Sequence, residues 1–143
     1  MFDYHVHLER GPLSVEWVQQ FLAQAARTGV TEVGIVEHLH LFREAQHIFH
    51  NNLVGDSERR SIGDFLKLIE DVKAQGLPVK WGLEVDFIPG AEAKIKKFLE
   101  TLPLDFVIGS VHWIGDWPFD YEASTWNGRN VPEVYSAYYD LLA

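Results

Sequence analysis

Histidine and carboxylate side chains recur along this sequence at spacings that suit a metal centre. The first two are His5 and His7, separated by Val6 near the N-terminus. Side chains two residues apart in a strand point the same way, so both imidazoles could bind one cation, with Tyr4, Val6 and Leu8 on the opposite face. Two histidines at a strand end can equally be satisfied by ordinary hydrogen bonds, and this pair alone does not decide between the two.

Similar residues follow three later apolar runs of the chain. In chain order they are Glu37, His38 and His40, then Glu84 and Asp86, and finally His112. Imidazole and carboxylate ligands without sulfur suit Zn²⁺, Mn²⁺ or Fe²⁺. Because the set exceeds what one tetrahedral ion needs, we expect two or three ions, with a carboxylate such as Glu84 bridging a pair. We expect Glu37 and Asp86 to accept hydrogen bonds rather than to bind metal, and His40 could be either a site residue or a loop histidine.

Paired divalent ions about 4 Å apart are the usual means of hydrolysing phosphate esters, because one generates hydroxide and both bind the reacting oxygens. Arg10 and Arg43 each follow a strand end that carries such residues. A guanidinium can bind phosphate through two hydrogen bonds, although each arginine taken singly is more simply explained as a solvated loop residue. The chemistry that these residues predict is metal-dependent hydrolysis of a small phosphorylated molecule.

The elements that must position these residues alternate between strands and helices. Apolar runs predict strands at residues 3–8, 33–36, 79–85 and 106–112. Helical spacing and capping residues predict helices at about 15–28, 62–75, 91–101 and 132–142. This order predicts an α/β fold with a parallel sheet, either open or part of a barrel. The carboxyl ends of all four strands then share one rim, where such folds place their sites.

Two segments between these elements carry no clear periodicity. We interpret residues 41–60 as a long loop with about one helical turn, in which His47 and His50 point to solvent. The loop at 113–130 is rich in tryptophan, and its rings could line a pocket for an imidazole or pack over the rim. These tryptophans are Trp113, Trp117 and Trp126.

Composition limits the classes of protein that fit. The 143 residues suffice for one ordinary domain, and 47% hydrophobic with 23% charged residues is the globular range. No apolar run has the length of a membrane span, and the lack of cysteine excludes thiolate metal sites and favours the cytoplasm. A formal net charge of −9 disfavours binding to nucleic-acid phosphates. A small anionic substrate remains compatible, because bound cations can reverse the sign of the charge locally.

Four short motifs occur here in the same order as in a known family. They are HxH at 5–7, Ile-Val-Glu-His at 35–38, Gly-Leu-Glu-Val-Asp at 82–86 and Gly-Ser-Val-His-Trp at 109–113. With these motifs the sequence resembles, over its whole length, the PHP (polymerase and histidinol phosphatase) superfamily, and most closely its monofunctional histidinol-phosphatases. The resemblance implies a distorted, TIM-like (β/α)7 barrel with a trinuclear metal site at its carboxyl rim.

Carried over by motif, the resemblance gives individual residues a role. His5 and His7 bind one ion, and Glu84 bridges it to a second. His112 binds the second ion and His38 a third, which makes Glu84 and His112 the residues expected to matter most for catalysis. The implied reaction is hydrolysis of histidinol phosphate to histidinol and phosphate in histidine biosynthesis.

The sequence departs from the family pattern in two places. Many members carry a further histidine in the loop after the HxH motif, and here Glu9 is the nearest substitute ligand. A later histidine and an Asp-x-His motif near the C-terminus are also absent from this chain. Because four strand–helix units are present, we expect residues 1–143 to be the N-terminal portion of a single PHP-type domain.

Two other functions remain open from the sequence. One is a nuclease or polymerase-associated module of the same superfamily, which the net acidity and the lack of a basic stripe disfavour. The other is a metal-binding fragment without turnover. An incomplete barrel would have an open sheet edge, so we expect self-association, and we expect neither nucleic acid nor a membrane as a partner.

Overall fold

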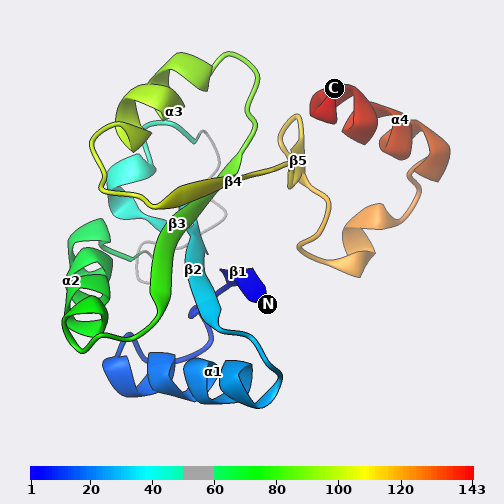
Figure 1. The fold of residues 1–143 in the computed structure, drawn as a ribbon. Coiled ribbons are helices and arrows are strands. Elements are labelled where there is room, and N and C mark those ends of the chain that lie inside the picture. Colours follow the sequence, from blue (N-terminus) through cyan, green and yellow to red (C-terminus); the bar gives the residue numbers. More distant parts are fainter. Residues whose placement is uncertain (50–59) are drawn as a thin grey trace.

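The computed structural model describes residues 1–49 and 60–143, and its centre is a curved sheet of four parallel strands (Figure 1). The strands pair in sequence order: β1 (Phe2–Val6), β2 (Glu32–His38), β3 (Val79–Asp86) and β4 (Phe106–Ser110). Sequential parallel strands joined by helices are the arrangement of part of a (β/α) barrel. The predicted α/β fold class is therefore confirmed.

Three helices lie along one side of this sheet and cover its outer face: α1 (Val15–Arg27), α2 (Ile62–Ala74) and α3 (Glu92–Leu99) (Figure 1). Phe65, Ile69 and Val72 of α2 are buried, and the Phe65 ring centroid lies 6.4 Å from that of Trp81 in β3. This packing holds the middle of the sheet in place. None of the helices in the described ranges is long and apolar enough to cross a membrane.

The first two helices begin at the predicted residues but are capped differently. The Ser14 hydroxyl accepts a hydrogen bond from the backbone N–H of Trp17 at 3.3 Å, as predicted for a cap. Ser61 precedes α2, but the Glu44 carboxylate accepts the hydrogen bond from the backbone N–H of Ile62, at 3.2 Å. A carboxylate also interacts favourably with the positive end of the helix dipole, so a residue distant in sequence replaces the local cap.

Two aromatic rings, those of Tyr4 in β1 and Phe106 at the start of β4, lie on the inner face of the sheet. Tyr4 stacks on Phe106 with ring centroids 5.2 Å apart, and a Cβ at Gly82 would come within 2.6 Å of the Phe106 ring. Gly82 and Glu84 share one face of β3, so Tyr4 lies on the same face as the site. The prediction that Tyr4 points away from the histidines is wrong, because the register of β1 against β2 shifts within β1.

Two 3₁₀-helices follow β2 where about one helical turn is predicted. They are η1 (Leu39–Leu41) and η2 (Arg43–Ala45). Phe42 between them is fully buried and pairs with Arg60 through a short parallel bridge. His47 is exposed, as predicted, and His50 lies outside the described residues.

The segment after β4 extends away from the sheet (Figure 1). It contains a hairpin of β5 (Trp113–Ile114) and β6 (Trp117–Pro118), the 3₁₀-helix η4 (Ala123–Trp126), and α4 (Val131–Leu142). Tyr138 of α4 contacts Phe119 with ring centroids 5.5 Å apart, but no residue of α4 is buried. The last helix is therefore present as predicted, with its apolar side largely exposed.

Candidate metal centre

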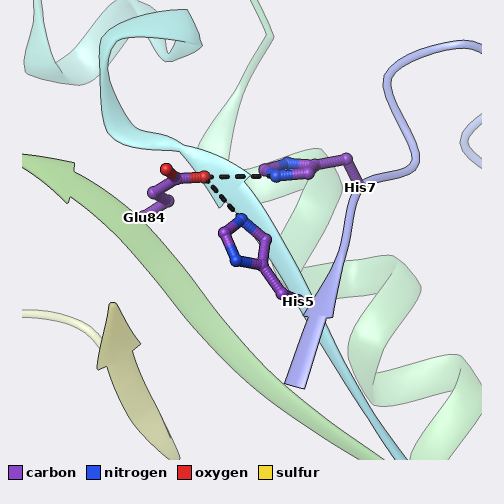
Figure 2. Close-up of side chains that lie close together, drawn as sticks. All are labelled: His5, His7 and Glu84. Carbon is purple, nitrogen blue, oxygen red and sulfur yellow. Dashed lines mark hydrogen bonds and ion pairs between the residues drawn. The ribbon is translucent and has the colours of Figure 1, made fainter. Parts of the chain in front are cut away.

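Glu84 lies at the centre of a cluster at the carboxyl ends of the strands. Its side chain is buried, and its Oε2 lies 2.9 Å from Nε2 of His5 and 3.1 Å from Nε2 of His7 (Figure 2). Nε2 of His38 is 3.4 Å from the same oxygen, and Nε2 of His112 is 3.4 Å from Oε1. The structure thus brings together the four histidines and the carboxylate that the sequence predicts for one rim.

Strand pairing explains this convergence. His38, the last residue of β2, is the direct partner of Glu84 in β3. His5 lies within β1, and His7 is the first residue after it. His112 follows β4 by two residues. Because the four strands are parallel and adjacent, these positions meet at one end of the sheet.

The ligand atoms form three overlapping groups, and within each group all atoms lie within 4.8 Å of one another. The groups are His5–His7–Glu84, His7–Glu9–His38 and His38–Glu84–His112. Two ligands of a tetrahedral ion, each about 2.1 Å from it, are about 3.4 Å apart. The N–O distances of 2.9–3.4 Å around Glu84 are close to that spacing. The donor set therefore fits divalent metal, and His7, His38 and Glu84 each belong to two groups.

Glu9 extends the cluster on its solvent side. Its Oε2 lies 3.7 Å from Nδ1 of His38, a looser contact than those around Glu84. Nδ1 of His7 and Nδ1 of His38 are both buried and have no hydrogen-bond partner within the described residues. Buried imidazole nitrogens without a partner are expected where a ligand has yet to bind. Glu9 thus lies where a substitute ligand is predicted.

Burial and hydrogen bonding set the charge of the cluster. Burial alone raises the pKa of Glu84, but hydrogen bonds with His7 and His5 and the charge of His38 lower it to about 2. Burial lowers the pKa of His38 to about 4. The hydrogen bond with Glu84 raises the pKa of His7. At neutral pH, Glu84 is therefore a carboxylate and His38 a neutral imidazole, which are the forms that bind metal.

Asp86 orients two histidines, His112 and His40, through hydrogen bonds. Its Oδ1 accepts hydrogen bonds from Nδ1 of His112 at 2.7 Å and from the backbone N–H of His112 at 3.0 Å. Its Oδ2 lies 3.3 Å from Nδ1 of His40. Burial raises the pKa of Asp86, but these bonds lower it to about 2, and the bond to Asp86 raises the pKa of His112. The prediction that Asp86 is a hydrogen-bond partner is confirmed, and Nε2 of His112 is left facing Glu84.

Glu37 has a structural contact rather than a ligand position. It is fully buried, and its Oε1 accepts a hydrogen bond from the backbone N–H of Leu8 at 2.7 Å. Burial raises the pKa of Glu37. Glu37 belongs to none of the three ligand groups, so it fixes the backbone between His7 and Glu9. The hydrogen-bond acceptor predicted here is present, but it binds backbone rather than an imidazole.

A cavity of about 580 Å³ lies beside the cluster and is large enough for a small substrate. Its wall combines imidazole, aromatic and charged groups, which include His38, His40, His112, Trp113, Tyr121, Glu9, Asp120, Arg10 and Arg60. Asp120, whose Oδ2 lies 3.9 Å from Nε2 of His112, was not singled out by the sequence. It lies in an irregular loop, where no periodic pattern marks it.

The arginines at the cavity differ from those that the sequence indicates. Arg10 lines the cavity as predicted, whereas Arg43 is exposed and is not part of its wall. Arg60 lines the cavity instead, and its Nη2 donates a hydrogen bond to the backbone oxygen of Glu9 at 2.8 Å. A search at strand ends could not find Arg60, because it lies two residues before α2, at the other end of a strand–helix connection.

The three tryptophans divide between the cavity and the C-terminal segment. Trp113 lines the cavity, and its ring centroid lies 4.7 Å from that of His40. Trp117 packs against Trp126 at 5.1 Å and lies under the guanidinium of Arg129 at 3.6 Å. Of the two roles predicted for tryptophan, a place in the pocket wall therefore applies to Trp113 alone.

Comparison with known proteins agrees with this geometry. A family model described as the PHP domain matches residues 3–143. The "Probable histidinol-phosphatase" of Deinococcus radiodurans is 37% identical over 79 residues, which cover 54% of this chain and 30% of that protein. The "Histidinol-phosphatase" of Lactococcus lactis subsp. lactis is 26% identical over 117 residues, which cover 80% of this chain and 40% of that protein. The matched part of the chain thus spans less than half the length of either relative.

Proposed function

The chain belongs to the PHP domain family, and we propose that it forms the metal-binding part of a phosphomonoesterase that hydrolyses histidinol phosphate to histidinol and phosphate. The observation that carries this proposal is the convergence of four histidines on the buried carboxylate of Glu84, beside a cavity of suitable size. The names of the two relatives support the substrate and a place in histidine biosynthesis. The lack of cysteine supports a reducing compartment, which we propose is the cytoplasm.

We propose that two or three ions of Zn²⁺, Mn²⁺ or Fe²⁺ bind to the three ligand groups. His5 and His7 would hold the first ion, Glu84 would link it to a second held by His112, and His38 would hold a third with Glu9. When bound, such ions supply a hydroxide nucleophile and compensate the charge of the phosphate oxygens.

Other groups of the site set the orientation, position and charge of these ligands. The Asp86 carboxylate keeps the proton on Nδ1 of His112, so the lone pair of Nε2 faces Glu84. Glu37 holds the backbone at Leu8 and thereby the loop that carries Glu9. Glu84 stays ionised because its pKa is about 2, which keeps a negative charge between the imidazoles at any working pH.

The cavity suits the two ends of a small phosphate ester. Arg10 supplies positive charge for the phosphate group, and Trp113 supplies an aromatic wall for an imidazole ring. Arg43 remains a sequence prediction without a place in the cavity wall. The formal charge of −9 and the small size of the cavity disfavour a nucleic-acid substrate.

A second candidate function is metal binding without turnover. It is favoured by one observation, namely that the matched region spans only 30% and 40% of the two relatives. In this candidate, the ligands here bind metal, and catalysis depends on residues from the parts of the relatives that this chain does not match. The two candidates share the metal centre and differ in catalysis.

A phosphate-release assay separates these functions. The purified chain, loaded with Mn²⁺ or Zn²⁺, is incubated with histidinol phosphate and, in parallel, with single-stranded DNA. We expect phosphate release from histidinol phosphate and intact DNA. Digestion of the DNA would instead assign the nuclease function, and bound metal with no product from either substrate would assign the non-catalytic one.

A further inference from the structure

Arg60 places a guanidinium beside the metal-binding loop without providing a ligand. Its Nη2 donates a hydrogen bond to the backbone oxygen of Glu9 at 2.8 Å. Glu9 belongs to the ligand group that also contains His7 and His38. The positive charge of Arg60 therefore lies next to this group and faces the same cavity as His38 and His112.

The backbone of Arg60 is held by two backbone hydrogen bonds that involve none of the proposed metal ligands. Its N–H donates to the backbone oxygen of Leu41 at 2.9 Å, and its own oxygen accepts from the backbone N–H of Arg43 at 3.0 Å. These bonds form the short parallel bridge to Phe42, which is fully buried. The guanidinium thus extends from a fixed point towards the Glu9 loop.

Among the described residues, the side chain of Arg60 makes one hydrogen bond, which goes to Glu9. The group carries five N–H donors, and within the described residues one of its nitrogens makes the bond to Glu9. It forms no ion pair with a carboxylate of the described ranges, although Glu9 and Asp120 both line the cavity. A guanidinium in a cavity wall, with donors that no described residue occupies, is suited to an anionic ligand.

We infer that Arg60 is a substrate-binding residue that donates hydrogen bonds to the phosphate oxygens of a phosphomonoester held beside His38 and His112. The inference rests on the proposed function for its substrate, while the anion chemistry comes from the position of Arg60. Arg60 takes the role that the sequence suggests for Arg43. Arg10, on the same wall, adds charge but is more exposed, so we assign the larger part to Arg60.

Binding of inorganic phosphate to the Mn²⁺-loaded chain tests this directly, because it needs no turnover. Titration calorimetry is run on the wild type and on R60A, R60K, R60Q and R43A, with the metal content of each sample measured. The control is R27A, which removes an exposed arginine at the end of α1. We expect R60A and R60Q to bind phosphate at least about tenfold more weakly at unchanged metal content, R60K to lose less, and R27A to match the wild type.

Three outcomes would overturn the inference. One is phosphate affinity in R60A within twofold of the wild type. Another is a loss in R43A with none in R60A, which would return the role to Arg43. The third is loss of Mn²⁺ from both R60A and R60Q, which would show that Arg60 only holds the Glu9 loop.

These experiments distinguish a failure of the Arg60 inference from a failure of the proposed substrate. Phosphate binding that depends on Arg60, in a chain that does not hydrolyse histidinol phosphate, would sustain the anion site and refute the substrate. Hydrolysis of histidinol phosphate with the same KM in R60A as in the wild type would sustain the substrate and refute the anion site.

Discussion

Two regions of this molecule carry similar sequence patterns and reach different structural outcomes. The helix α2 and the strands beside it bury their apolar residues and bring the polar strand ends into one cluster. The helix α4 has a comparable apolar side, but Tyr135, Tyr139 and Leu142 remain about half exposed or more. An amphipathic pattern is thus enough to specify a helix, whereas burial needs a neighbouring surface. The histidines and Glu84 meet at one end of the sheet because the four strands that position them pair with one another.

The largest effect on activity is expected from a substitution of Glu84, at the centre of the cluster. In a preparation that hydrolyses histidinol phosphate, Glu84→Gln should lower kcat by about 10² or more and change KM far less. A carboxylate that spaces the ligands stabilises the transition state more than it binds substrate. Steady-state kinetics at saturating metal provide the measurement, and unchanged turnover would remove Glu84 from this role.

The contrast between the two helices can be tested with one matched pair of substitutions. Leu68→Ala in α2 removes a buried side chain and should lower the free energy of unfolding by about 2–5 kcal/mol. Leu142→Ala in α4 removes an exposed one and should change it by less than about 0.5 kcal/mol. Urea denaturation followed by circular dichroism gives both values, and equal losses would contradict the difference drawn between the regions.

The pH dependence of metal binding reports on the protonation of the rim. The carboxylate partners of His7 and His112 raise the pKa values of both, so each imidazole keeps its proton to a higher pH than usual and releases that proton when metal binds. Glu84 and His38, with pKa values of about 2 and about 4, are already in the binding form near neutral pH. Apparent Mn²⁺ affinity should therefore fall as pH falls below these raised values, by about tenfold per pH unit for each proton displaced.

A matched variant sharpens this pH test. Asp86→Asn removes the carboxylate that raises the pKa of His112, so the slope of affinity against pH should become shallower. The measurement is a set of Mn²⁺ titrations between about pH 5.5 and 8. Affinity that does not change over this range would contradict the protonation states assigned to the cluster.

The smallest effect is expected on self-association, from a substitution at an edge of the sheet. Within the described strands, β1 and β4 each pair on one side only, and Val107 of β4 is 46% exposed beside an apolar groove formed with α3. We propose that these surfaces self-associate, because open edges and apolar patches favour contact between copies. Light scattering should show oligomers in the wild type and fewer in Val107→Lys. A stable monomer at all concentrations would refute this.

The sequence predicts which residues lie at the rim, because each of them stands at the end of a strand that its own apolar run marks. The carboxyl ends of adjacent parallel strands lie at the same edge of the sheet. His5, His38 and Glu84 can therefore be placed together from the strand ends alone. The features that it misses depend on contacts between distant segments. Glu44 caps α2 from a position 18 residues earlier in the chain, and Arg60 lines the cavity and bonds to the Glu9 loop.

Irregular strand geometry accounts for the remaining difference. Alternation along a regular strand places Tyr4 opposite His5, but the shift of register within β1 brings both to the inner face. Such a bulge leaves no clear mark in a stretch as short as residues 3–8. The position of His7 is unaffected, because it follows the strand and still contacts Glu84.

The central claim is that His5, His7 and Glu84 form a metal site, and metal content tests it most directly. The chain is loaded with Mn²⁺ or Zn²⁺, passed through gel filtration and analysed by mass spectrometry of the metal. The comparison is with the double variant His5→Ala, His7→Ala and with His47→Ala, which removes an exposed histidine outside the three ligand groups. We predict at least one ion per chain in the wild type and in His47→Ala, and loss of most of it in the double variant. Equal metal content in the wild type and the double variant would contradict the account.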